Sequence, residues 1–232
     1  MRPLPKAVLF DKDGTLIDFH RTWDRATGVA LRAVAPSDSA LETAAAAIGF
    51  DLTNDKIIPG SPMVAESNDV LVALLSPHLD AEVFAEKLFR ASMDSINPAV
   101  GADSLTASLH ARGVPLAVVT NDWAEVVEHQ LAALGCRDRF QAVLAADSGF
   151  GAKPEPGMVH AATDALGVAG SDALMVGDSS HDLRAGRSAG VPTVLVTNST
   201  EPDPSVARLA DVIVASLAEL AELLGLDQPQ EM

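Results

Sequence analysis

Near the N-terminus, an apolar run leads directly into two closely spaced carboxylates, in Val8-Leu9-Phe10-Asp11-Lys12-Asp13-Gly14-Thr15. A short apolar run bounded by a turn residue such as Gly14 is typical of a strand buried on both faces of a parallel sheet. Asp11 and Asp13 then lie just past the carboxyl end of that strand. Ligands bind at this edge of an open α/β sheet. The stretch therefore predicts a parallel sheet with a polar site at its edge.

Asp11 and Asp13 are suited to phosphoryl transfer. Asp11 could attack phosphorus as a nucleophile, and Asp13 could protonate the leaving oxygen and later activate water. Gly14 permits a tight turn that lets backbone N–H groups face the phosphoryl oxygens. The alternative interpretation is an Asp-rich turn with no catalytic function.

Three more polar groups follow farther along the chain, at Thr120-Asn121, Lys153-Pro154 and Asp178 to Asp182. Thr120 and Asn121 offer a hydroxyl and an amide to phosphate oxygens, and the Lys153 ammonium can neutralise the cluster. Asp178 and Asp182 supply the hard oxygen ligands that Mg²⁺ prefers. The alternative for Asp182 is helix capping together with its neighbouring serines, which would leave Asp178 unexplained.

From residue 99 onward the pattern alternates between strands and helices. Predicted strands lie at 114–120, 140–144, 173–177, 192–196 and 212–215, and predicted helices at 102–112, 154–166, 182–189, 206–210 and 217–224. A further helix follows Asp122, which with Glu125 would form a capping box. This alternation predicts an α/β fold: a three-layer, Rossmann-like core whose parallel sheet is covered on both faces.

Residues 17–97 interrupt this alternation, because they are far longer than a single crossover needs. Their pattern is helical, with expected helices at 21–35, 41–48, 62–75 and 81–93. We therefore expect an α-helical domain at 17–97, inserted into a core made of residues 1–16 and 98–232.

Composition restricts the partners and the compartment. The net charge of −16, from 32 acidic and 16 basic residues among 232, disfavours nucleic acid and anionic membrane surfaces as partners. Lone Cys136 cannot form an intramolecular disulfide, which suits a reducing cytoplasm. No apolar run reaches the roughly 18 residues of a spanning helix. We expect a cytoplasmic protein without a membrane or nucleic-acid partner, and the oligomeric state stays open.

The four polar groups together resemble the four motifs of the haloacid dehalogenase superfamily. The match runs through Asp11-Lys12-Asp13-Gly14-Thr15-Leu16, Thr120-Asn121, Lys153-Pro154 and Gly177-Asp178-Ser179-Ser180-His181-Asp182. It is nearest to phosphoglycolate-phosphatase-like hydrolases with a helical cap inserted after the first motif. The resemblance implies a Mg²⁺-dependent phosphatase that hydrolyses a small phosphorylated metabolite, such as phosphoglycolate or a sugar phosphate, through an aspartyl-phosphate.

The resemblance also implies a role for each matched position. Asp11 would be the nucleophile and a Mg²⁺ ligand, and Asp13 the general acid/base that also binds the metal through its backbone carbonyl. The remaining roles fall to residues that hold the phosphoryl group (Thr120, Asn121, Lys153 and Gly14), balance charge (Lys153), ligate the metal (Asp178) or support it indirectly (Asp182).

Three other functions stay open on the same fold. A sugar phosphomutase uses the same motifs but returns the phosphoryl group to a sugar. A phosphonate-cleaving relative would need a lysine in the inserted domain as a Schiff base. A non-catalytic phosphate-binding protein would be marked by loss of Asp11, Asp13 or Asp178, and the sequence retains all three.

Overall fold

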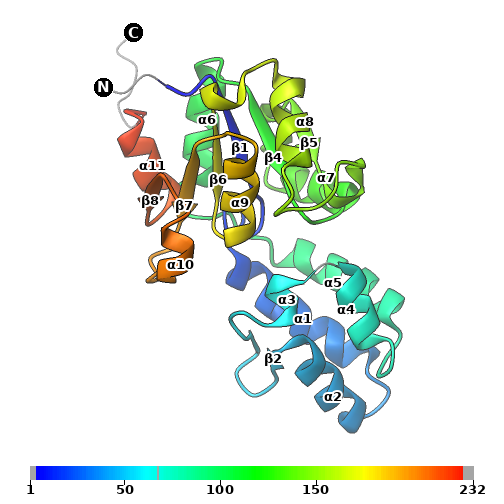
Figure 1. Cartoon of the computed structure of the whole chain (residues 1–232). Helices are drawn as coiled ribbons and strands as arrows, with labels where there is room; N and C mark the ends of the chain where they lie inside the picture. The colour runs from blue at the N-terminus through cyan, green and yellow to red at the C-terminus, as the bar shows by residue number, and fades with distance from the viewer. Residues whose placement is uncertain (1–3, 67, 227–232) are drawn as a thin grey trace. The chain divides into compact units, whose positions relative to one another are not determined.

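The structure is a computed structural model that describes residues 4–66 and 68–226, without the side chains of residues 65, 68 and 69. The chain forms two compact units, both visible in Figure 1. We call residues 1–18 with 98–232 the core unit, and residues 19–97 the helical unit. Ile17 and Asp18, which the sequence analysis assigned to the insertion, lie in the core unit. Ile17 forms isolated bridges with Asp13 and Pro98 there.

The core unit contains a six-stranded parallel sheet in the order β5-β4-β1-β6-β7-β8. Its strands are β1 (Ala7–Phe10), β4 (Leu116–Val119), β5 (Ala142–Leu144), β6 (Ala173–Gly177), β7 (Thr193–Val196) and β8 (Val212–Val214). Its helices are α6 (Ala102–Ala111), α7 (Ala124–Ala133), α8 (Gly157–Leu166), α9 (Ser180–Ser188), α10 (Pro204–Ala207) and α11 (Leu217–Leu223). Short 3-10 helices lie at Arg137–Arg139, Ala146–Ser148 and Gly170–Asp172.

Side-chain alternation along β1 separates the two faces of the sheet. Val8 and Phe10 belong to a buried cluster with side chains of α6, α7 and α11, whereas Ala7 and Leu9 pack with side chains of α8 and α9. All four side chains are fully buried. Helices therefore cover both faces of the sheet (Figure 1), and the predicted three-layer α/β core is confirmed.

Strand β1 marks the point at which the strand order reverses. It pairs with β4 on one side and β6 on the other, so that Leu9 lies opposite both Ala117 and Met175. The connections that follow β1 and β6, which are neighbours in the sheet, run in opposite directions from the carboxyl ends of these strands. Such a switch point opens a crevice beyond the strand ends, where ligands of α/β proteins bind.

The helical unit consists of α1 (Phe19–Val34), α2 (Asp38–Ile48), α3 (Pro62–Ala65), α4 (Asn68–Leu75) and α5 (Ala81–Asp94), with a small hairpin of β2 (Phe50–Asp51) and β3 (Lys56–Ile57). Its apolar core includes Leu31, Ile48, Ile57, Leu75 and Phe84. The sequence pattern did not predict the hairpin, because strands of two residues are too short for a period-2 signal.

Several expected helix bounds differ from the structure, and two of these differences concern the interior or the start of a helix. The helix expected at 62–75 is divided into α3 and α4, because Glu66 adopts an extended conformation (φ −101°, ψ 161°) and its N–H closes the first turn on Pro62. The helix expected from Pro154 begins at Gly157. Before it, residues 152–155 form a turn in which the Glu155 N–H donates to the Ala152 carbonyl at 2.9 Å.

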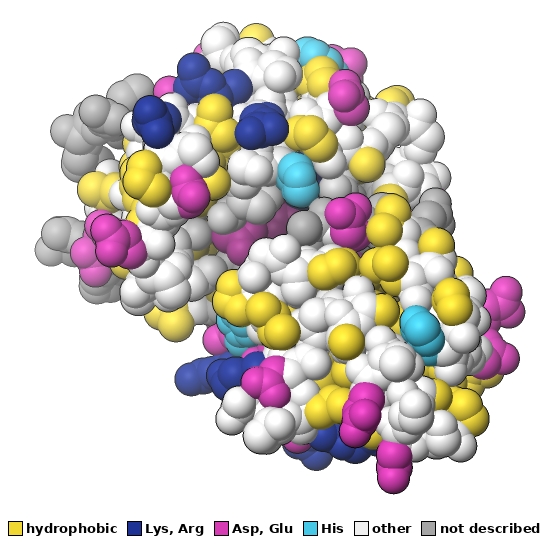
Figure 2. All heavy atoms as spheres, turned by 60° about the horizontal axis from the view of Figure 1, so that its bottom comes forward, with side chains coloured by type: hydrophobic (Ala, Val, Ile, Leu, Met, Phe, Trp, Pro, Cys, Tyr) yellow, Lys and Arg dark blue, Asp and Glu magenta, His cyan; other side chains and the backbone are white. Residues whose placement is uncertain are grey.

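Charged and apolar side chains are interspersed on the surface. Figure 2 shows hydrophobic side chains at several places on one face, and the exposed ones in the helical unit include Val29, Ile58 and Val83. Within residues 4–66 and 68–226, none of the helices combines the length and the apolar character that a bilayer crossing requires.

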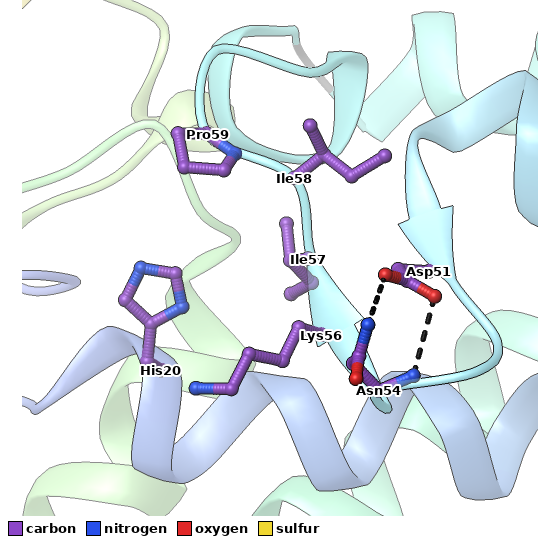
Figure 3. Close-up of a pocket in the computed structure, with 7 residues that line it drawn as sticks. All are labelled: His20, Asp51, Asn54, Lys56, Ile57, Ile58 and Pro59. Atoms are coloured by element: carbon purple, nitrogen blue, oxygen red, sulfur yellow. Dashed lines mark hydrogen bonds between the residues drawn. The ribbon is translucent and has the colours of Figure 1, made fainter.

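The helical unit carries a cavity of about 580 Å³ beside its hairpin. Figure 3 shows the lining residues His20, Asp51, Asn54, Lys56, Ile57, Ile58 and Pro59. The Asp51 carboxylate accepts from the side-chain and backbone nitrogens of Asn54 at 2.8 and 3.2 Å, which shapes the hairpin turn. The Lys56 side chain points toward His20 in Figure 3, so Lys56 brings a positive charge to the lining of this cavity.

Candidate active site

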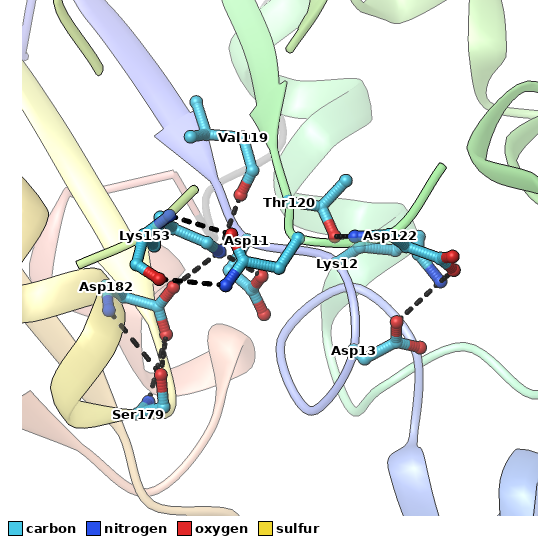
Figure 4. Close-up of polar contacts among 10 residues, drawn as sticks. Asp11, Lys12, Asp13, Val119, Thr120, Asp122, Lys153, Ser179 and Asp182 are labelled. Carbon is cyan, nitrogen blue, oxygen red and sulfur yellow. Dashed lines mark hydrogen bonds and ion pairs between the residues drawn. The ribbon is translucent and has the colours of Figure 1, made fainter. Parts of the chain in front are cut away.

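Lys153 joins the ends of two strands and a helix at the carboxyl edge of the sheet. Its ammonium donates to Asp11 Oδ1 at 2.6 Å, to Asp182 Oδ1 at 2.6 Å and to the Val119 carbonyl at 2.7 Å (Figure 4). Three acceptors match the three hydrogens of an ammonium group. Asp11 directly follows β1, and its N–H continues the strand ladder by donating to Val176 at 2.8 Å. The site is therefore anchored in the sheet itself.

Three carboxylates gather around this ammonium. Asp11, Asp178 and Asp182 each offer an oxygen, and these atoms all lie within 4.8 Å of one another. Three carboxylates against one ammonium leave a net charge of −2 when all are ionised. Burial and the neighbouring charges both change the pKa values of these carboxyl groups. Burial, together with the charge of Asp182, raises the pKa of Asp11 to about 7 against the opposing effect of Lys153.

The pKa of Asp178 is raised in the same way as that of Asp11. Burial, reinforced by the neighbouring charges of Asp11 and Asp182, holds the pKa of Asp178 well above its ordinary value. Crowded, buried carboxyl groups that resist ionisation are stabilised by a cation. A set of oxygen ligands alone, which would carry a net charge of −2 beside Lys153 if all were ionised, fits a hard divalent cation such as Mg²⁺.

Asp182 serves both of the roles considered from the sequence. Its Oδ1 accepts from Lys153, while its Oδ2 accepts from the N–H of Ser179 at 3.0 Å and from the Ser179 hydroxyl at 2.7 Å. Ser179 is the N-cap of α9, and the pair forms a capping box. Because both oxygens of Asp182 accept from protein groups, this residue fits a supporting role beside the other two carboxylates.

Gly14 lies against Asp178 so closely that no side chain would fit. Its φ is +84°, and a Cβ at this position would lie 1.9 Å from Asp178 Oδ2. The Gly14 N–H donates to the Ile17 carbonyl at 2.9 Å, so a phosphate contact through this group stays a prediction. Its carbonyl accepts from Asn198 Nδ2 at 2.7 Å. Asn198 was not predicted from the sequence, because it lies beyond β7 and carries no motif signal.

Thr120 and Asn121 follow β4 at the same edge. The buried Thr120 hydroxyl accepts from the Asp122 N–H at 3.2 Å. The Asn121 side chain accepts from the Lys153 N–H at 2.8 Å and donates to the Lys153 carbonyl at 3.0 Å. Asn121 therefore holds the backbone of the segment that delivers the Lys153 ammonium. Phosphate contacts by Thr120 and Asn121 stay predictions.

Asp13 belongs to a second charged cluster, built around Lys12. The Lys12 ammonium is 2.6 Å from Asp13 Oδ2, 3.1 Å from Asp122 Oδ2 and 2.6 Å from Gln130 Oε1. Burial alone would lower the pKa of Lys12, but the carboxylates of Asp13 and Asp122 outweigh burial and raise it. Figure 4 shows the Asp13 carboxylate directed toward the Lys12 ammonium.

This cluster corrects the capping box that was expected at Asp122 and Glu125. Trp123 is the N-cap of α7, and the Ala124 N–H donates to Asp147 Oδ1 at 3.0 Å. The Asp122 carboxylate is instead drawn to the buried Lys12 ammonium, which needs a counter-charge more than an exposed helix end does. The alternation along β1 could have predicted this contact. Val8 and Phe10 lie on the face of the sheet that α7 covers, and the next residue in that alternation is Lys12.

Comparisons with known proteins agree with this geometry. Residues 8–196 match the family described as haloacid dehalogenase-like hydrolase. The chain is 31% identical to a phosphoglycolate phosphatase from Rhodospirillum rubrum, covering 97% of this chain and 93% of that protein. It is 28% identical to the pyrophosphatase PpaX from Halalkalibacterium halodurans, covering 94% and 96%. The crystal structure of CbbY from Rhodobacter sphaeroides shares the fold, with a TM-score of 0.69, 24% identity and coverage of 97% and 100%.

Proposed function

Because the chain belongs to the haloacid dehalogenase-like hydrolase family, we propose that it is a Mg²⁺-dependent phosphatase acting through an aspartyl-phosphate. Its substrate is a small phosphomonoester of the phosphoglycolate or sugar phosphate class. Relatives that are 28–31% identical over nearly the whole chain carry phosphatase and pyrophosphatase names, which supports phosphoryl hydrolysis over the other reactions of this fold.

One observation carries the proposal. The Asp11 carboxylate lies at the switch point of the sheet, held by an ammonium through Oδ1 and bordered by two further carboxylates. A nucleophile in this setting is fixed in direction, and its second oxygen can approach phosphorus. The same arrangement is poorly suited to passive binding, since a phosphate would meet an excess of negative charge without a cation.

Asp11 and Asp178 would hold Mg²⁺, with Asp182 supporting them and the Asp13 backbone carbonyl as a further ligand. When bound, the cation offsets the charge of the carboxylates and of the phosphoryl oxygens. The gathering of three carboxyl groups around a single ammonium supports this assignment. So does the raised pKa of Asp11 and of Asp178, because burial and like charge are what a cation relieves.

In the first half of the reaction, an Asp11 carboxylate oxygen forms a bond to phosphorus, and the bond from phosphorus to the leaving oxygen breaks. Asp13 gives its proton to that oxygen, which departs as an alcohol. The Lys153 ammonium holds the other Asp11 oxygen in place and neutralises part of the charge on the phosphoryl group. Thr120 and Asn121 bind phosphoryl oxygens beside it.

In the second half, water attacks the aspartyl-phosphate. The Asp13 carboxylate takes a proton from the water as its oxygen bonds to phosphorus, and the bond from phosphorus to Asp11 breaks. Inorganic phosphate leaves, and both carboxyl groups return to their starting states. The helical unit (residues 19–97) acts as the cap that limits water and selects the substrate. The enzyme works in the cytoplasm, where small phosphate esters occur.

The test is phosphate release from a panel of phosphomonoesters, including phosphoglycolate and hexose phosphates, with Mg²⁺ and with EDTA. We expect Mg²⁺-dependent release that Asp11→Asn abolishes, because the nucleophile is lost while the shape is kept. Asp172→Asn is the matched control, since Asp172 forms a surface ion pair with Lys6. Transfer of the phosphoryl group to a sugar phosphate without hydrolysis would indicate a mutase. A folded protein that binds phosphate but turns over no ester would refute the proposal.

A further inference from the structure

Lys12 lies between Asp11 and Asp13 in the sequence, and its side chain is fully buried. Its ammonium contacts Asp13 at 2.6 Å, Asp122 at 3.1 Å and Gln130 at 2.6 Å. Gln130, on α7, is also fully buried, and it lies 118 positions from Lys12 in the sequence. One ammonium thus joins the loop after β1, the turn after β4 and helix α7.

Filling space does not explain an ammonium here. The side chains that continue this face of β1 are apolar and pack with Val127 and Leu131 of α7. Replacing buried ion pairs by apolar residues of similar volume is often neutral or stabilising. Burial of the Lys12 ammonium is costly in itself and is compensated only by the acceptors around it. The function of the Lys12 ammonium therefore lies in the side chains that it contacts, Asp13, Asp122 and Gln130.

We infer that Lys12 is a positioning residue that fixes the Asp13 carboxylate for proton transfer, with Asp122 and Gln130 as its anchors. This inference rests on the proposed phosphatase activity. The backbone on either side of Asp13 is already fixed, because the Lys12 carbonyl accepts from the N–H groups of Leu16 and Ile17 at 2.8 and 2.9 Å. The side chain of Asp13 is 24% exposed, and its Oδ2 lies 2.6 Å from the Lys12 ammonium, so Lys12 helps to set the direction of this carboxylate.

An acid/base must be held within hydrogen-bond reach of the oxygen it protonates. Asp122 directly follows the Thr120-Asn121 pair that is proposed to bind phosphoryl oxygens. By pairing with Asp13 and Asp122 at once, Lys12 ties the proton donor to the strand end that holds the phosphoryl group. The residue that transfers the proton and the residues that bind the phosphoryl group are thereby held in position by the same ammonium.

The test compares kcat/KM for two substrates, an alkyl phosphate and p-nitrophenyl phosphate, in the full-length enzyme with Mg²⁺. An alkoxide needs a proton as it leaves, whereas p-nitrophenolate hardly does. We expect Lys12→Met to lower kcat/KM about 100-fold for the alkyl ester, at the low end of general acid–base effects, and less than about tenfold for the aryl ester. Lys6→Met, which removes a surface ion pair with Asp172, should change neither.

A double-mutant cycle isolates the connection to Asp13. In the Asp13→Asn background, adding Lys12→Met should lower aryl ester turnover less than about threefold, because the group that Lys12 positions is already gone. Equal losses for both esters, or independent losses in the cycle, would show that Lys12 has only a structural role. Wild-type enzyme that releases no phosphate from either ester would instead overturn the proposed function, and the positioning role with it.

Gln130→Met keeps the inference testable if Lys12→Met does not fold. This variant removes one 2.6 Å hydrogen bond to Lys12 and leaves every charge in place. We expect a loss of about three- to tenfold in kcat/KM for the alkyl ester and less than twofold for the aryl ester. Unchanged or equally lowered values for the two esters would contradict the role assigned to Lys12.

Discussion

Replacing Lys153 by methionine should unbalance the carboxylate cluster. In the wild type, the Lys153 ammonium is buried and donates to Asp11, Asp182 and the Val119 carbonyl, each at 2.6 to 2.7 Å. Methionine keeps much of the volume but removes the only ammonium in contact with Asp11 and Asp182 among the described residues. Removing one partner of a buried ion pair costs about 3–5 kcal/mol of stability. We expect that loss in the metal-free variant at pH 8.

The loss should be smaller at lower pH. Burial already raises the pKa of Asp11 to about 7, so the folded state binds protons above pH 4 that the unfolded chain has released. Stability contributed by such groups falls as pH rises toward 7. Lys153 opposes this rise in pKa, so the variant carboxyl groups should stay protonated to higher pH. At about 1.4 kcal/mol per pH unit for each proton, the difference between variant and wild type should shrink by roughly 1–2 kcal/mol at pH 6.

Urea unfolding followed by circular dichroism, with EDTA at pH 6 and pH 8, measures these differences. Lys6→Met is the matched control, because exposed ion pairs contribute only about 0–1 kcal/mol. Mg²⁺ should restore part of the stability of Lys153→Met at pH 8, since it supplies the missing positive charge, while turnover stays lost. A loss that is equal at the two pH values, or no larger than that of the control, would refute the electrostatic reasoning.

Three further perturbations test the site around Gly14. Gly14→Ala should lower stability by about 1–3 kcal/mol, because φ is +84° and the new Cβ would collide with Asp178. Calorimetric titration of this variant should also show at least tenfold weaker Mg²⁺ binding. Unchanged Mg²⁺ binding would contradict the close contact between Gly14 and Asp178. Asp178→Asn should abolish the rise in melting temperature that Mg²⁺ gives the wild type, so a retained rise would exclude Asp178 as a ligand. Asn198→Ala should cost about 0.5–1.5 kcal/mol in urea unfolding through its lost bond to the Gly14 carbonyl, and a neutral effect would show that the turn does not depend on it.

The sequence alone predicted the polar edge of the sheet. Apolar runs too short for helices identified the strands, and parallel strands end at one edge, so Asp11, Lys153, Asp178 and Asp182 could be expected together. The structure brings these four side chains into one cluster. Local chemistry also sufficed for the N-cap of α9, because Ser179 and Asp182 are three residues apart and interact within one turn.

The partners that are distant in the sequence could be found only from the packing of the elements. The residues around Asp122 predict a helix cap. In the structure, Asp122 instead pairs with Lys12, which lies 110 positions earlier in the chain. A buried ammonium needs a carboxylate beside it, and the fold brings Asp122 close enough. The division of the expected 62–75 helix at Glu66 likewise carries no periodic signal. Periodicity reports which face of an element is buried, and capping motifs report its ends. Neither reports which distant side chain will meet a buried charge, because that depends on how the elements pack.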